Sequence, residues 1–78
     1  MALRTLIETI AKALVQHPDE VEVSEFDSDT TTIFELRVAR DDLGKVIGRD
    51  GRTAQYMRTL LTAASSKAGR RAHLDIID

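Results

Sequence analysis

The chain has 78 residues, of which 42% are hydrophobic and 31% charged, with a net charge of −2 and no cysteine. Its length allows one domain with a small core, and its composition excludes the low hydrophobicity and high charge of a disordered chain. The lack of cysteine excludes a disulfide scaffold and a thiolate zinc site, and it favours the cytosol. We therefore expect a single cytoplasmic domain over residues 1–78.

Charge is distributed unevenly along the chain. Residues 1–35 carry two basic and eight acidic side chains, whereas residues 36–78 carry nine basic and five acidic ones. Between residues 45 and 71, Asp50 is the only acidic residue among seven basic ones: Lys45, Arg49, Arg52, Arg58, Lys67, Arg70 and Arg71. Each charge reaches only about 8 Å at physiological salt, so a local basic surface can bind phosphate on an acidic protein.

A run of apolar residues near the N-terminus follows helical spacing. The residues on its apolar face are Leu3, Leu6, Ile7, Ile10 and Leu14. Charged residues interrupt the run on another face, so it predicts an amphipathic helix over residues 2–16 rather than a signal peptide or a membrane span. We expect no association with membranes. Pro18 ends the helix.

The next two segments alternate as strands do. Val21 and Val23 alternate with polar residues, residues 27–29 are turn formers, and residues 31–39 are rich in β-branched and aromatic side chains. The residues that share the apolar face of the second segment are Phe34, Leu36 and Val38. The pair is predicted to be a β-hairpin.

The second half of the chain predicts two helices and a strand. Asp41 or Asp42 can cap a short helix over residues 43–47, which Gly48 ends. A longer helix runs from Arg52 to about Lys67, with the buried stripe Ala54, Met57, Leu61, Ala64 and Ala68. Gly69 closes it, and a last strand carries Leu74 and Ile76. The element order α-β-β-α-α-β predicts an α+β fold.

The segment Gly48-Arg49-Asp50-Gly51 joins the two helices through a loop with glycine at both ends. In one interpretation it is only a turn, because glycine accepts positive φ without steric cost. Three features favour an anion site instead. The loop leads into a helix N-terminus with unpaired N–H groups, Arg49 projects from it with Lys45 and Arg52 beside it, and aliphatic residues precede it.

The sequence Ile47-Gly48-Arg49-Asp50-Gly51 resembles the I-G-x-x-G signature of KH domains, whose loop clamps about four nucleotides of single-stranded nucleic acid. With a helix and a strand placed first, the order of elements resembles the type II KH fold, a three-stranded sheet packed on one face by three helices. The segment from Val46 to Ala54 resembles the V-I-G-[RK]-x-G-R-T signature of the KhpA family, small stand-alone bacterial KH-domain proteins.

The resemblance implies an RNA site. Gly48, Arg49, Asp50 and Gly51 would form the clamp and Arg52 would support it. Val46 and Ile47 either border an apolar groove for bases or belong to the core. Arg37 and Val38 are weaker candidates for the opposite wall of that groove. Asp50 places a carboxylate beside phosphate and so lowers the expected affinity.

The sequence contains no recognisable pattern of catalytic residues. The sequence has no nucleophile elbow, Walker A lysine, dinucleotide-type glycine spacing or set of metal ligands. We therefore expect neither an enzyme nor a cofactor, metal or small-molecule substrate.

A second apolar face, Tyr56, Leu60 and Ala63, adjoins the core stripe of the long helix. It either covers a core edge or forms an interface, since a small chain gains stability by self-association. The resemblance implies a homodimer or a heterodimer with a larger KH-domain partner, KhpB, and a role as an RNA chaperone linked to cell shape and the cell envelope. The alternative function is a protein-interaction module with a purely structural loop.

Overall fold

The computed structural model describes residues 2–77. Its elements are α1 (Leu3–Leu14), β1 (Glu22–Ser28), β2 (Thr31–Arg37), α2 (Leu43–Ile47), α3 (Arg52–Ser66) and β3 (Arg71–Ile77). Short 3-10 turns at Pro18–Glu20, Arg40–Asp42 and Arg49–Gly51 connect them. The order of the helices and strands is the predicted one.

The hairpin turn is tighter than its composition indicates. Residues 27 and 28, predicted to be part of the turn, belong to β1, and Ser28 pairs with Thr31. The turn therefore consists of residues 29 and 30, and Asp29 has a φ of 47°, a conformation that aspartate tolerates better than most side chains.

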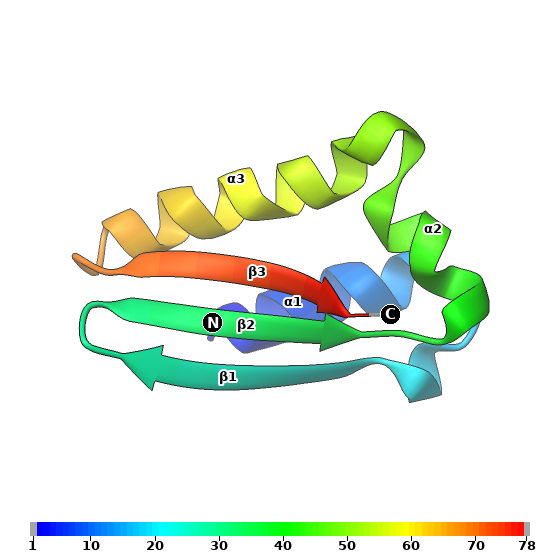
Figure 1. Ribbon diagram of the computed structural model, residues 1–78, viewed down its shortest axis with the longest axis horizontal. Helices are drawn as coiled ribbons and strands as arrows, with labels where there is room; N and C mark the ends of the chain where they lie inside the picture. The colour runs from blue at the N-terminus through cyan, green and yellow to red at the C-terminus, as the bar shows by residue number, and fades with distance from the viewer. Residues whose placement is uncertain (1, 78) are drawn as a thin grey trace.

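The sheet is mixed and has β2 at its centre (Figure 1). β1 pairs with β2 in antiparallel orientation, and β3 pairs with β2 in parallel orientation. Parallel neighbours need a long crossover connection, and α2, the loop and α3 form it. The sheet order leaves β1 and β3 as the two edge strands.

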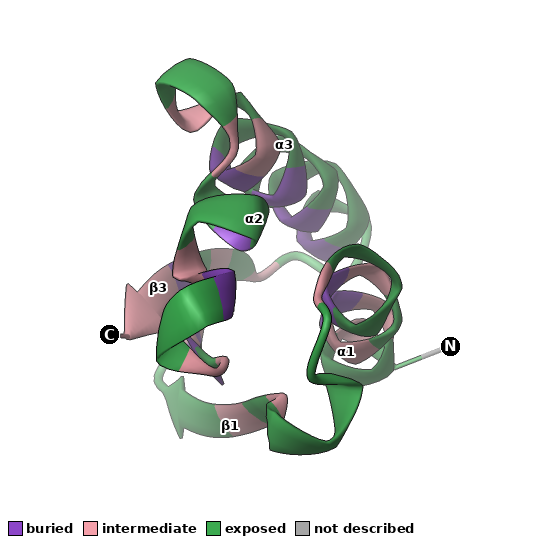
Figure 2. Ribbon diagram, turned by 90° about the vertical axis from the view of Figure 1, so that its right-hand side faces the viewer, coloured by how far each residue is buried: buried purple, intermediate pink, exposed green. Residues whose placement is uncertain are grey.

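All three helices lie on one face of the sheet (Figure 2), and the core fills the space between. It is a single cluster of buried residues: Ile7, Ala11, Phe34, Leu36, Val46, Met57, Leu61 and Leu74. Within residues 2–77 no helix is long and apolar enough to cross a membrane.

The buried stripe of α3 differs from the prediction at its C-terminal end. Ala54, Met57 and Leu61 are buried as expected, but Ala64 is exposed and Ser65 is buried in its place. At 100° per residue, Ser65 continues the line of these three residues more closely than Ala64 does. Its hydroxyl donates to the carbonyl of Thr62 at 3.2 Å. Ala68 lies beyond the end of the helix and is exposed.

Candidate nucleic-acid interface

Three of the four residues in the loop between α2 and α3 have positive φ. Gly48 has φ 79° and ψ 173°, Asp50 has φ 57° and ψ 25°, and Gly51 has φ 73° and ψ 12°. The amide of Gly51 donates to the carbonyl of Gly48 at 3.1 Å. The loop is thus one closed turn between two helices, and positive φ favours glycine at both ends.

The two glycines differ in their surroundings. A Cβ at Gly48 would overlap the side chain of Thr53 and lie 2.9 Å from its backbone nitrogen, whereas a Cβ at Gly51 would meet nothing within 4 Å. Gly48 is therefore required both by its φ and by the close approach of the first turn of α3. Gly51 is required by its φ alone.

The loop projects from the body of the domain at the end where α2 meets α3 (Figure 1). The amide of Arg52, the first residue of α3, donates to the carbonyl of Arg49, and no side chain caps the amides that follow it, so these can meet a ligand. Arg49 and Arg52 are exposed, and neither forms a salt bridge within residues 2–77. Amide donors and two unengaged guanidinium groups therefore occur together, as binding of a phosphodiester requires.

The predicted residues before the loop separate into different roles. Val46 is fully buried in the core, so its side chain is not accessible to a base. Ile47 is 37% exposed and is the apolar side chain next to the loop. Lys45 is partly exposed, and its Nζ lies 3.5 Å from Oδ1 of Asp42. Lys45 therefore has a partner within the protein, unlike Arg49 and Arg52.

Asp42 has a different role from the predicted one. It occupies the position before α2, but its carboxylate makes no capping hydrogen bond to that helix. Instead Oδ1 accepts from the amide of Gln16 at 3.1 Å and Oδ2 from the amide of His17 at 3.0 Å. The prediction that Asp41 or Asp42 caps the helix is thus wrong for Asp42, because the free amides after α1 are the donors in reach.

The edge of the sheet beside α3 is β3, not β2. Both edges of β2 are paired, so the strand that carries Arg37 has no free edge to offer a ligand. The roles of Arg37 and Val38 in the opposite wall stay predictions. Arg58 of α3 reaches β3, where its Nε donates to the carbonyl of Leu74 at 3.4 Å.

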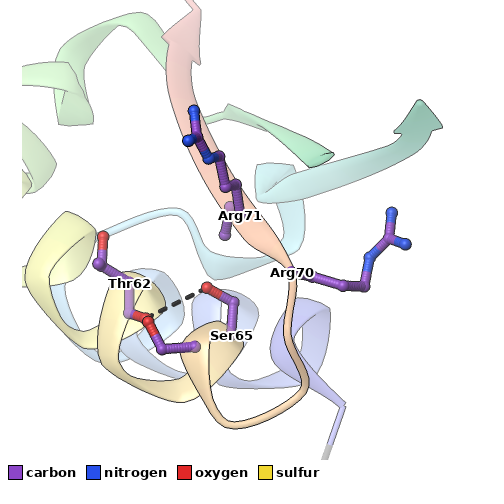
Figure 3. Close-up of a pocket in the computed structure, with 6 residues that line it drawn as sticks. Thr62, Ser65, Arg70 and Arg71 are labelled. Atoms are coloured by element: carbon purple, nitrogen blue, oxygen red, sulfur yellow. Dashed lines mark hydrogen bonds between the residues drawn. The ribbon is translucent and has the colours of Figure 1, made fainter. Parts of the chain in front are cut away.

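The basic residues after α3 are partly engaged. Arg70 ties the chain to the β1–β2 hairpin, donating to the carbonyl of Asp29, the hydroxyl of Thr32 and a carboxylate oxygen of Asp27. Arg70 also lines the hollow between α3 and β3 with Thr62, Ser65 and Arg71, and its side chain extends away from Thr62 and Ser65 (Figure 3). Arg70 therefore has a structural role, and its guanidinium group is engaged within the protein.

The second predicted face is exposed. Tyr56 and Leu60 are 65% and 51% exposed, and Ala63 is exposed too. Leu60 and Ala63 line a shallow hollow between α1 and α3 together with Leu6, Ala64 and Lys67. The sequence pattern did not indicate the contribution of α1, because Leu6 lies on the predicted core face of its own helix.

The parallel β2–β3 pair and the G-x-x-G loop between two helices of the crossover define a type II KH domain. The chain belongs to the KhpA/KhpB KH-domain family, whose model matches residues 4–76.

Several relatives are similar over nearly their whole length. A protein of Halalkalibacterium halodurans named RNA-binding protein KhpA is 54% identical, covering 97% of this chain and 100% of the relative. Proteins of the same name from Clostridium acetobutylicum and Aquifex aeolicus are 49% and 46% identical, covering 96% and 99% of this chain and 100% and 98% of their own. These names are those of RNA-binding proteins rather than enzymes.

One solved structure supports the fold independently. The crystal structure of Aquifex aeolicus Era Y63A bound to GDP·AlF4− superposes with a TM-score of 0.60 at 17% identity. The match covers 97% of this chain and 31% of that one. At this identity the similarity concerns the fold alone.

Proposed function

We propose that the chain binds single-stranded RNA through the loop Gly48–Gly51, with Arg49 and Arg52 as its phosphate ligands. The observation that carries the proposal is the joint exposure of an uncapped helix N-terminus and two arginines without salt bridges. The names of the relatives support RNA as the ligand.

Bases would lie between Ile47 and the free edge of β3. Ile47 supplies apolar surface, and Arg58 beside the Leu74 carbonyl leaves its terminal nitrogens for base edges. No aromatic residue adjoins the loop, so stacking contributes little. With Asp50 beside the phosphates, we expect modest affinity and low sequence specificity.

The cellular role follows from resemblance to the KhpA family. We propose a cytoplasmic RNA chaperone or post-transcriptional regulator that contributes to cell shape and cell-wall biogenesis. A protein of one small domain and modest affinity fits such a role when a second RNA-binding domain acts with it, because linked sites raise the effective concentration of RNA.

The test is titration of a labelled single-stranded RNA pool with wild type, Arg49→Asp and Arg37→Asp at two salt concentrations. Arg37 is an exposed arginine on the sheet face away from the helices, so it is a matched control for the change in charge. We expect Arg49→Asp to lose salt-sensitive binding and Arg37→Asp to keep it. Circular dichroism checks that all three are folded. Equal binding by all three would leave the loop as a structural turn.

A second function is supported by the exposed face of α3. Tyr56, Leu60 and Ala63, with the hollow against α1, suit a second copy of this chain or a larger KH-domain partner such as KhpB. We expect a homodimer that Leu60→Glu converts to a monomer in sedimentation experiments. Gln55→Glu, which adds the same charge about 140° around α3, should leave the dimer intact. A wild-type protein that sediments as a monomer would contradict the proposed homodimer.

A further inference from the structure

Asp42 is a buried carboxylate that joins two distant parts of the chain. It is fully buried, and it accepts hydrogen bonds from the amides of Gln16 and His17, 26 and 25 residues earlier. Consecutive backbone amides form a concave site for an anion. Here that anion is a side chain of the protein itself, and it holds the end of α1 against the start of α2.

α2 places Asp42 close to the loop. The helix has five residues, Leu43–Ile47, and ends where Gly48 begins the turn. At 1.5 Å per residue such a helix is only about 7.5 Å long. A displacement of its first residue therefore also displaces the loop at its other end. Val46 packs this helix into the core at one point, and Asp42 attaches it at a second.

The negative charge of Asp42, considered by itself, is unfavourable for RNA binding. Burial by itself raises the pKa of Asp42, but hydrogen bonds from Gln16, His17 and Lys45 outweigh it and hold the pKa below its ordinary value. The carboxylate is therefore ionised at neutral pH, next to a helix that leads to a site for phosphate. An electrostatic effect and a positional effect of Asp42 on RNA binding thus have opposite signs.

We propose that Asp42 is a positioning residue for the RNA-binding loop. By fixing α2 to the two amides that follow α1, it sets the orientation in which Gly48–Gly51 presents its donors. The assignment rests on the proposed function of the loop.

The test compares Asp42→Asn with Asp41→Asn. Asp41 is the preceding residue, is exposed and carries the same charge, so it is a matched control. The amide of asparagine can accept from only one of the two backbone donors and turns its own N–H groups toward the other. We expect the RNA dissociation constant to rise about tenfold in Asp42→Asn, within the usual range of coupling between sites. It should stay unchanged or fall slightly in Asp41→Asn.

Binding is measured at a temperature at which circular dichroism shows all proteins folded, so that a loss of stability alone does not change the dissociation constant. Binding by Asp42→Asn as tight as by wild type would overturn the assignment and leave the loop site standing. No binding by wild type would overturn the proposed function and this assignment together.

A second measurement needs no variant. Coupling between two sites is reciprocal. If RNA binding depends on the position of α2, bound RNA must also stabilise the hydrogen bonds that fix α2 in that position. We expect saturating single-stranded RNA to slow hydrogen exchange at the amides of Gln16 and His17, although these lie after α1 and outside the loop. Unchanged exchange at both amides, with RNA bound, would show that Asp42 serves stability only.

Discussion

At the scale of single residues, the two loop glycines are predicted to differ in their tolerance of alanine. Gly51→Ala should cost about 1–2 kcal/mol for its left-handed conformation, and Gly48→Ala should cost more because its Cβ also overlaps Thr53. Gly44→Ala is the control: it lies inside α2 with nothing within 4 Å, so it should stabilise by about 0.5–1 kcal/mol. Urea unfolding measures all three. Equal costs at Gly48 and Gly51 would contradict the close approach of α3.

The buried carboxylate predicts how stability depends on pH. The pKa of Asp42 is lower in the folded protein than in the unfolded chain. Its contribution to stability is therefore complete above the unfolded pKa and is lost as pH falls through the folded pKa. In thermal melts from about pH 5 to about pH 2, the difference in stability between wild type and Asp42→Asn should narrow. Asp41→Asn should follow wild type throughout, and a constant difference for Asp42→Asn would exclude a charged Asp42.

At the scale of elements, neighbouring leucines on α3 separate core from surface. Leu61 is 2% exposed and belongs to the core cluster, so Leu61→Ala should destabilise by about 2–5 kcal/mol. Leu60 faces outward, and Leu60→Ala should change the stability of the monomer by no more than about 0.5 kcal/mol. The measurement is urea unfolding at low protein concentration. A large cost for Leu60→Ala that grows with concentration would indicate that a second copy covers this face.

Sequence periodicity predicted the helices and strands well because each element buries one face. Ile7 in α1, Phe34 in β2 and Leu61 in α3 each lie on the apolar face that the periodicity of their element predicts, and all three are buried. The link from Asp42 to Gln16 and His17 could not be predicted in this way. An aspartate before a helix is typical of a cap, and a hydrogen bond across 25 residues leaves no local pattern. Likewise the order of the strands along the chain does not reveal that β2, with Arg37, is the central strand and that β3 is the edge strand beside α3.

At the scale of the whole molecule, topology separates the two signs of charge. β1, the edge strand on one side, and its flanking turns carry much of the acidic first half of the chain. The loop and β3 lie toward the other side, with most of the basic second half. Because surface charges are screened beyond about 8 Å, RNA near the loop is little affected by the acidic edge. The negative net charge is therefore compatible with a phosphate-binding site.

The number of arginines at the loop sets how strongly the affinity for RNA depends on salt concentration. Arg49 and Arg52 are the two arginines that we assign to phosphates, and each phosphate neutralised on a single strand contributes about −0.7 to the slope of log affinity against log salt. The expected slope for wild type is therefore about −1.4, and Arg49→Ala should reduce it to about −0.7. Arg37→Ala should leave the slope unchanged, because that side chain is on the opposite face of the sheet. A wild-type slope about twice as steep, about −2.8, would mean that Lys67 and Arg71 also contact phosphates, and that RNA follows α3 to its C-terminal end.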